Sequence, residues 1–380
     1  MKITGDWLTH PGTQSLCAAL ESAGHQALFV GGCVRNALLG VPVSDIDIST
    51  DAHPETVTQI SENAGFRVVP TGIDHGTVTV IAKGVSHEVT TFRRDVETDG
   101  RRAVVAFSTD ITEDAARRDF TMNALYADAR GKVIDPLGGL PDLTAHRLRF
   151  VGDAHQRIRE DALRILRFFR FHAHYGDPAQ GIDAEGLSAC AELADTVETL
   201  SRERVGAEMR KLLFAPDPAP SVAAMHQAGV LIRILPGSDP RALAPLVHLE
   251  NGLPPSWQRR LATIGGADPT DPLRLSRTES ATQTAIRDAI GAMQTPAALG
   301  WALGVDAATD TLLARAVLLD FPLPPNWQAE ISRGAAATCP VQAADLMPAL
   351  QGPALGRALK ALQTRWLASN LQLTRGELLA

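Results

Sequence analysis

The sequence has few cysteines and no long apolar run. Four of its 380 residues are cysteines and none forms a Cys-x-x-Cys pair, so we expect free thiols and no structural zinc site. No stretch approaches the roughly 18 uninterrupted apolar residues of a membrane span. The opening MKITGDWLTHPGTQ has neither an apolar signal core nor a basic amphipathic presequence. We therefore expect a cytoplasmic protein without a membrane partner.

An excess of positive charge is also lacking. Lys and Arg number 36 against 43 Asp and Glu, which gives a net charge of −7. This balance argues against a surface covered with basic residues for nucleic acid, but it leaves room for a local basic groove. The length is too great for one compact core and indicates two or three domains.

Strand and helix patterns are mixed in the first part of the chain and helical patterns dominate the rest. QALFV (26–30) predicts a buried strand, and the alternation in DIDIST (45–50) predicts a half-buried one. Glycine-containing turns at Lys83-Gly84 and Arg130-Gly131 predict two hairpins. From residue 155 onward Ala, Leu and Arg dominate, which favours helices.

The stretch GGCVRNALLGVPVSDIDIST (31–50) combines features that suit a phosphate ligand. Gly31 and Gly32 follow a strand, so backbone N–H groups can approach phosphate closely. Arg35 follows on the next helix, where a guanidinium can fork onto phosphate oxygens and the helix N-terminus adds its dipole. The order of strand, glycine pair, arginine and acidic pair is more specific than any one of these features.

The acidic pair predicts a metal site. In a strand Asp45 and Asp47 point to one face while Ile46 and Ile48 point to the core, and paired carboxylates suit Mg²⁺. A lone Asp-x-Asp is also common on solvated strands and in glycosyltransferases. Glu88, in the later strand HEVTTFR, changes this balance: if the strands are neighbours, three carboxylates can hold the two metals used for in-line phosphoryl displacement.

Together these segments resemble the class II tRNA nucleotidyltransferase and poly(A) polymerase family, within the DNA-polymerase-β-like nucleotidyltransferases. GGCVRNALLG…DIDIST resembles its opening motif and HEVTTFR the strand of its third acid. TDGRR resembles its flexible loop, RRDFTMNALYAD its ribose-binding motif and EDALRILRFFRF its base-selecting motif. The matches run in order from about residue 28 to 172, and GPALGRALKALQTRW resembles the end of the tail domain less specifically.

The resemblance implies an α+β fold, in which an N-terminal DNA-polymerase-β-like nucleotidyltransferase domain with a mixed sheet is followed by all-helical domains. It divides the chain into a catalytic head (1–140), a helical nucleotide-selecting neck (141–215) and a helical RNA-binding body and tail (216–380). We expect no added phosphohydrolase domain, because the C-terminal half lacks a His-Asp metal motif.

A base can be chosen by hydrogen-bond polarity alone. We predict one helix over 159–170, with Asp161 and Arg164 on the same face. A carboxylate only accepts and a guanidinium only donates, so the pair fits the amino group and ring nitrogen that cytosine and adenine share, and rejects uracil and guanine. An ordinary surface ion pair is the alternative. The resemblance places Arg167 and Arg170 on the nucleotide or its phosphates.

The segment ARRDFTMNA carries the remaining implied contacts. Arg118 and Asp119 resemble the family's phosphate and ribose contacts, and a carboxylate that accepts from the 2′-hydroxyl favours ribonucleotides. We expect Asn123 to brace this turn or the ribose. Asn36 stands where family members commonly have Asp, and we expect it to orient the Arg35 helix.

The implied activity is template-independent addition of C and A from CTP and ATP to the tRNA 3′ end, with Mg²⁺ as cofactor. Bacterial poly(A) polymerases carry a basic GRRF-like insertion before the third acid, and VIAKGVSHEV lacks it, which favours CCA addition. An enzyme that adds only C or only A remains open. An inactive RNA-binding homologue is the non-enzymatic alternative, and the intact acids argue against it.

Overall fold

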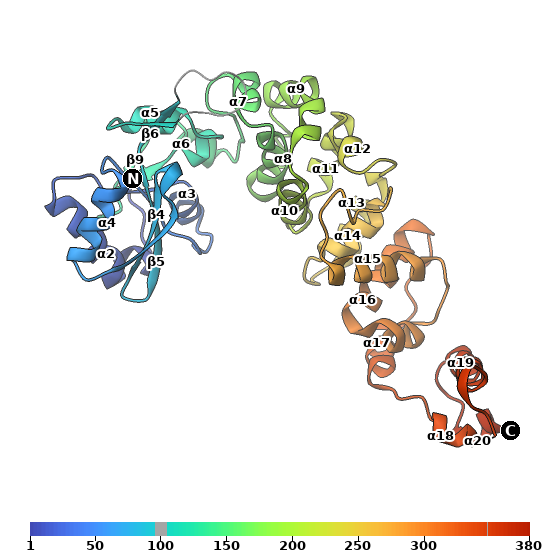
Figure 1. The fold of residues 1–380 in the computed structure, drawn as a ribbon. Coiled ribbons are helices and arrows are strands. Elements are labelled where there is room, and N and C mark those ends of the chain that lie inside the picture. The colour runs from blue at the N-terminus through green and yellow to red at the C-terminus, as the bar shows by residue number, and fades with distance from the viewer. Residues whose placement is uncertain (96–104, 348) are drawn as a thin grey trace. The chain divides into compact units, whose positions relative to one another are not determined.

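The computed structural model describes residues 1–95, 105–347 and 349–380 (Figure 1). The chain forms two compact units, Met1–Thr199 and Leu200–Ala380, and each is described by itself. The predicted flexible loop TDGRR falls outside the described residues.

The first unit is built on a mixed seven-stranded sheet of order β3-β4-β5-β2-β1-β8-β9. β2 and β5 are parallel, and the other neighbouring strands are antiparallel. The separate strands β6 and β7 form a hairpin. The strands are β1 (Leu28–Val30), β2 (Asp47–Thr50), β3 (Arg67–Gly72), β4 (Thr77–Ala82), β5 (Val85–Thr91), β6 (Arg93–Asp95), β7 (Val105–Phe107), β8 (Tyr126–Ala127) and β9 (Val133–Ile134).

Both predicted hairpins form, β4–β5 around Lys83-Gly84 and β8–β9 around Arg130-Gly131. Lys83 and Gly84 both have positive φ, which a tight two-residue hairpin turn requires. Ile46 and Ile48 are buried, as the alternation in DIDIST predicts. The acidic pair is thereby turned away from the core.

Helices pack on part of the sheet and complete the first unit. α2 and α4 contact strands β4 and β5. The helices are α1 (Asp6–Thr9), α2 (Pro11–Ser22), α3 (Gly32–Leu39), α4 (Pro54–Asn63), α5 (Ile111–Ala116), α6 (Leu140–Thr144), α7 (Ala154–Glu160), α8 (Leu163–Tyr175) and α9 (Ala184–Glu192), with 3₁₀ turns η1 (Ile73–His75), η2 (Thr121–Asn123) and η3 (Ala194–Thr199).

The prediction of one helix over 159–170 is wrong. α7 ends at Glu160 and α8 begins at Leu163. Between them Asp161 has an extended backbone (φ −152°, ψ 105°), and its Oδ1 accepts a 3.1 Å hydrogen bond from the Leu163 N–H. Asp161 therefore lies at the junction of two helices, where it ends α7 and its side chain bonds to the first residue of α8.

The second unit is helical in its described residues. Its helices are α10 (Arg202–Leu213), α11 (Ala219–Gln227), α12 (Val230–Ile234), α13 (Leu243–Glu250), α14 (Trp257–Ile264), α15 (Arg277–Ile290), α16 (Pro296–Leu318), α17 (Trp327–Ala336), α18 (Ala343–Leu346), α19 (Gly352–Ala368) and α20 (Arg375–Leu379), with the 3₁₀ turn η4 (Pro240–Ala242). Across the part of the chain that the structure describes, no helix combines the length and apolar character needed to cross a membrane.

Candidate active site

The glycine turn joins β1 to α3. Gly31 has φ +68° and ψ −119°, a backbone conformation open to glycine and strained for other residues. A Cβ here would lie 3.3 Å from Nη1 of Arg118. Gly32 then opens α3. The glycine pair therefore brings bare backbone and the guanidinium of Arg118, instead of that of Arg35, together at the start of a helix, and its contact with phosphate stays a prediction.

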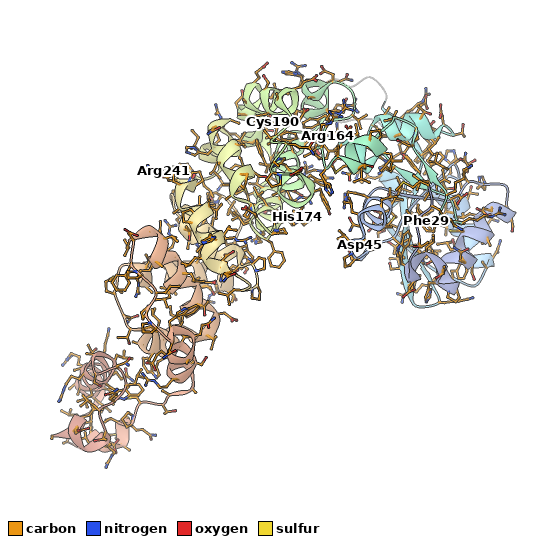
Figure 2. The ribbon with its side chains drawn as sticks, turned by 180° about the vertical axis from the view of Figure 1, so that it is seen from behind. Phe29, Asp45, Arg164, His174, Cys190 and Arg241 are labelled. Atoms are coloured by element: carbon orange, nitrogen blue, oxygen red, sulfur yellow. The ribbon has the colours of Figure 1, made fainter. Side chains whose placement is uncertain are left out.

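The carboxylates lie on neighbouring parallel strands. Asp47 on β2 is in register with Glu88 on β5, and the Glu88 N–H donates to the Ile46 carbonyl at 3.0 Å. Asp45 is exposed on the loop before β2, where the Ser44 hydroxyl donates to it at 2.9 Å (Figure 2). Partial burial, and then the Glu88 carboxylate, raise the pKa of Asp47 to about 6, while Arg118 opposes the shift.

This donor set fits Mg²⁺, because Asp45 and Asp47 offer hard oxygen ligands. The three acids are not closed into a ready cage. Among the described residues, no three His, Cys, Asp or Glu side chains are gathered closely enough to hold a metal ion. Convergence of Glu88 on the same ion therefore stays a prediction.

Arg118 is held between the glycine turn and β2. Its Nη2 donates to Asp114 at 3.1 Å and to the Ser49 hydroxyl at 3.4 Å, and its Nε donates to the Tyr126 hydroxyl at 3.1 Å. The Tyr126 hydroxyl also donates to Asp114 at 2.7 Å. Although burial alone would raise the pKa of Asp114, Arg118 and Tyr126 hold it below its usual range. Sequence reasoning missed Asp114 and Tyr126.

Asp119 and Asn123 form a connected pair in the 3₁₀ region after α5. Oδ1 of Asp119 accepts from the Phe120 N–H at 2.8 Å and from the Asn123 amide at 2.9 Å. Its Oδ2 accepts from Nε of Arg167 at 2.7 Å. Burial favours a raised pKa, but Arg167 and these donors lower the pKa of Asp119 below its ordinary value. Asn123 thus braces the turn, and its contact with the ribose stays a prediction.

Arg35 is buried and its donors are engaged inside the protein. Nη1 donates to the Asn123 amide oxygen at 2.5 Å and Nη2 to the Tyr175 hydroxyl at 2.8 Å. Nε and Nη2 both donate to the Asn36 amide oxygen, at 3.1 and 2.9 Å. Burial lowers the pKa of this guanidinium. The predicted phosphate contact of Arg35 is not visible in this arrangement and stays a prediction.

Arg164 does not pair with Asp161 as a surface ion pair would. Its Nη1 donates to Glu160 at 2.7 Å and to the Arg157 carbonyl at 3.0 Å, and its Nη2 donates to the Arg117 carbonyl at 3.0 Å (Figure 2 labels Arg164 on α8). These contacts fix the direction of the guanidinium. Glu160 is a further residue that sequence reasoning missed.

A cavity of about 240 Å³ gathers much of the predicted nucleotide site. Its walls join the turn after α5 to the junction of α7 and α8, and they combine arginines with aspartates. Arg170 is not in its lining; its guanidinium lies 4.4 Å from the centre of the Phe171 ring. The cavity is lined by Arg93, Asp114, Arg117, Arg118, Asp119, Asp161, Arg164 and Arg167.

The mixed sheet, the glycine turn that opens a helix and the acids on two parallel strands define a nucleotidyltransferase head followed by helices. Residues 27–149 match the model of the poly A polymerase head domain. Residues 181–241 match the model described as a probable RNA and SrmB-binding site of polymerase A.

Similar proteins agree with these matches. A CCA-adding enzyme of Streptococcus pyogenes serotype M2 is 45% identical over 208 residues, 54% of this chain and 50% of that protein. The human mitochondrial CCA tRNA nucleotidyltransferase 1 is 41% identical over 203 residues, 53% of this chain and 47% of that protein. The solved structure of the Bacillus stearothermophilus CCA-adding enzyme in complex with CTP is similar to this chain, with a TM-score of 0.75 and 29% sequence identity. The match covers 94% of this chain and 92% of that structure's chain.

Residues 27–149 belong to the poly A polymerase head domain family, and the similar proteins confirm the resemblance to class II CCA-adding enzymes and poly(A) polymerases and the α+β fold predicted from the motifs. The matched region spans about half the length of the curated relatives.

Proposed function

We propose that this chain adds C and A nucleotides to the 3′ end of tRNA without a template, using CTP and ATP. The observation that carries the proposal is the cavity that brings Asp119, Asp161, Arg164 and Arg167 beside Arg118. The names of the similar proteins support the same chemistry, and the matched structure of the Bacillus stearothermophilus enzyme contains CTP.

In this proposal Asp161 and Arg164 read the base. Asp161 accepts from the exocyclic amino group and Arg164 donates to the ring nitrogen of cytosine or adenine. Since Glu160 and two backbone carbonyls hold Arg164, its donors have little freedom to turn toward a different pattern. Uracil or guanine would leave both charged groups unpaired, which costs about 1–3 kcal/mol or more.

The remaining cavity residues bind the ribose and phosphates. Asp119 accepts from the 2′-hydroxyl, while Arg167 and Asn123 keep its carboxylate ionised and oriented. Arg118 and the N–H groups of the Gly31-Gly32 turn bind the triphosphate.

Arg170 adds positive charge near the nucleotide or the RNA end. Asp45 and Asp47 would hold Mg²⁺, with Glu88 alongside, and the bound ions would activate the 3′-hydroxyl and neutralise the triphosphate. The 3′-oxygen forms a bond to the α-phosphorus, the bond to pyrophosphate breaks and the hydroxyl proton is released. The division into a catalytic head (1–140), a nucleotide-selecting neck (141–215) and an RNA-binding body and tail (216–380) is part of this proposal.

To test this, the protein is incubated with tRNA that lacks its last three, two or one nucleotides. Each labelled nucleoside triphosphate is supplied alone, and CTP and ATP are then supplied together. We expect addition that stops when CCA is complete. The Asp45→Asn, Asp47→Asn double variant is the matched control and should add nothing, because it removes the proposed metal ligands and nearly preserves side-chain size.

The other outcomes separate the alternatives. Growth past CCA with ATP would favour a poly(A) polymerase. Incorporation of only C or only A would favour a partial enzyme. No incorporation, with tRNA still bound, would favour an inactive RNA-binding homologue.

A further inference from the structure

Arg35 is 6% exposed, yet it makes hydrogen bonds to side chains from three separate parts of the first unit. It contacts Asn36 in its own helix, Asn123 in η2 and Tyr175 at the end of α8. A buried guanidinium is costly unless its donors are satisfied, so these partners must keep a defined arrangement around it.

The first arm of this junction reaches α8. Arg167, Phe171 and Tyr175 are spaced four residues apart and share one face of that helix. The guanidinium carbon of Arg35 lies 4.1 Å from the centre of the Tyr175 ring and 5.1 Å from that of Phe171. Arg167 also lies 5.1 Å from the centre of the Phe171 ring. Stacking and a hydrogen bond therefore attach this helix face to α3.

The contacts of the first arm form a closed network that begins and ends at Arg35. Arg35 donates to Asn123, Asn123 donates to Asp119, and Asp119 accepts from Arg167, which is two helical turns before Tyr175 on α8. Two separate attachment points fix both the position and the tilt of α8. The same helix carries Arg164, so the orientation of this proposed base-reading side chain depends on the closed network of contacts.

The second arm reaches the loop that carries Asp45. The Asn36 amide oxygen accepts twice from Arg35, and its amide nitrogen donates to the Pro42 carbonyl at 3.0 Å. Because Arg35 offers only donors and the Pro42 carbonyl only accepts, the Asn36 amide must point its oxygen toward Arg35 and its nitrogen toward Pro42. A carboxylate at position 36 could accept from Arg35 but could not donate to Pro42.

We propose that Arg35 is a buried positioning junction, whose Tyr175 arm sets the placement of α8 for base selection and whose Asn36 arm sets the loop before Asp45 for metal binding. This inference rests on the proposed function. It extends that function to Arg35, Asn36 and Tyr175, which act by positioning other residues of the site. It assigns Asn36 a task that an aspartate cannot perform.

Two single variants separate the arms. Tyr175→Phe keeps the stacked ring and removes one acceptor, so the preference for CTP over UTP should fall about three- to tenfold while Mn²⁺ affinity stays within about twofold. Asn36→Asp keeps the acceptor for Arg35 and removes the donor to Pro42, so Mn²⁺ affinity should weaken about threefold or more while the CTP preference is retained. Calorimetric binding of CTP and UTP, and Mn²⁺ binding followed by electron paramagnetic resonance, give both readouts without catalysis.

Phe169→Leu is the matched control. Phe169 is fully buried in α8, but it takes no part in the hydrogen bonds and aromatic stacking that hold Arg35. It should lower the melting temperature and leave both binding readouts unchanged. The proposal is overturned if Tyr175→Phe lowers only the melting temperature, or if Asn36→Asp binds Mn²⁺ as well as wild type. Wild-type protein that binds CTP selectively but extends no tRNA would defeat the proposed function and leave this binding test intact.

Discussion

The guanidinium groups of Arg118 and Arg164 are oriented by neighbouring residues that have no chemical role in the proposed reaction. Arg118 is fixed by Asp114, Tyr126 and Ser49, and Arg164 by Glu160 and backbone carbonyls. A flexible arginine would lose side-chain entropy on binding a ligand. Holding these guanidinium groups in advance reduces that cost for the nucleotide.

Gly31→Ala tests the glycine turn. The added Cβ would be strained by the positive φ and would press on Arg118 at 3.3 Å, so we expect loss of about 1–3 kcal/mol of stability and weaker CTP binding. Gly265→Ala is a close control, since Gly265 has φ +68° and ψ −139° but nothing within 4 Å of its added Cβ. Denaturant unfolding and CTP titration compare the two; equal CTP affinity in both variants would remove the turn from the nucleotide site.

Asp161→Ala tests base reading. The variant loses the acceptor for the exocyclic amino group, so the preference for CTP over UTP should fall roughly tenfold, while the Mg²⁺ concentration needed for activity stays unchanged. Single-nucleotide incorporation with each base measures the ratio. Because the Asp161 side chain also accepts from the first N–H of α8, Asp161→Asn serves as the control that keeps this acceptor. An unchanged ratio in the alanine variant would exclude Asp161 from base selection.

At the scale of secondary structure, strands β1, β2, β4, β5, β8 and β9 were predictable, whereas β3, the β6–β7 hairpin and the break between α7 and α8 were not predicted. Alternating acids and isoleucines identified β2, and its face followed from the period of two. The stretch REDALRIL has good helical residues throughout, so local propensity favours continuity. The break depends on the Asp161 side chain, which bonds to the Leu163 N–H in place of a helical carbonyl.

Some of the contacts that hold the site join residues far apart in the sequence, whereas Asp114 and Glu160 lie only four positions from the arginines they hold. Tyr175 is 140 positions from Arg35, and Arg118 is 69 positions from Ser49. Tertiary pairs of this kind have no periodic signal in one sequence. The motifs therefore named five of the eight residues that line the cavity, but not the neighbours that hold them there.

Asp142 offers a test of how α6 is attached. Its carboxylate accepts from the Thr121 hydroxyl at 2.8 Å and from Arg147 and Arg149, and although burial acts in the opposite direction, these donors lower its pKa. A lowered pKa contributes stability above the unfolded value near 4, which is lost as the pH falls through the folded pKa.

Asp142→Asn should therefore cost about 2 kcal/mol at pH 7 and progressively less below pH 4. Urea unfolding across that range measures the difference. Asp239→Asn removes an aspartate from a surface pair with Arg241 and should change stability by less than about 1 kcal/mol at any pH. A penalty for Asp142→Asn that stays constant down to pH 3 would contradict the ionic explanation.

At the scale of the whole chain, the two compact units are stabilised in different ways. The first unit has a sheet whose central strands are buried, whereas the second is a series of helices joined in part by buried charges. Glu250 accepts from Arg259 at 2.7 Å and from Arg260 at 2.6 Å, and Arg259 also donates to Asp310 at 3.0 Å. Arg260 further donates to the carbonyl of Leu213 at 2.7 Å, which attaches α14 to the end of α10.

Glu250→Gln should separate the stability of the units. It leaves two buried arginines short of their shared counter-charge, so we expect the second unit to lose about 3–5 kcal/mol. CTP binding should be retained, since every proposed nucleotide contact lies within residues 1–199. Calorimetry of the full chain should show one transition moving to lower temperature and another unchanged, with CTP affinity within about twofold of wild type. Loss of CTP binding in parallel with that transition would mean that the nucleotide site depends on the helical unit, because the substituted residue makes its ionic contacts only within residues 200–380.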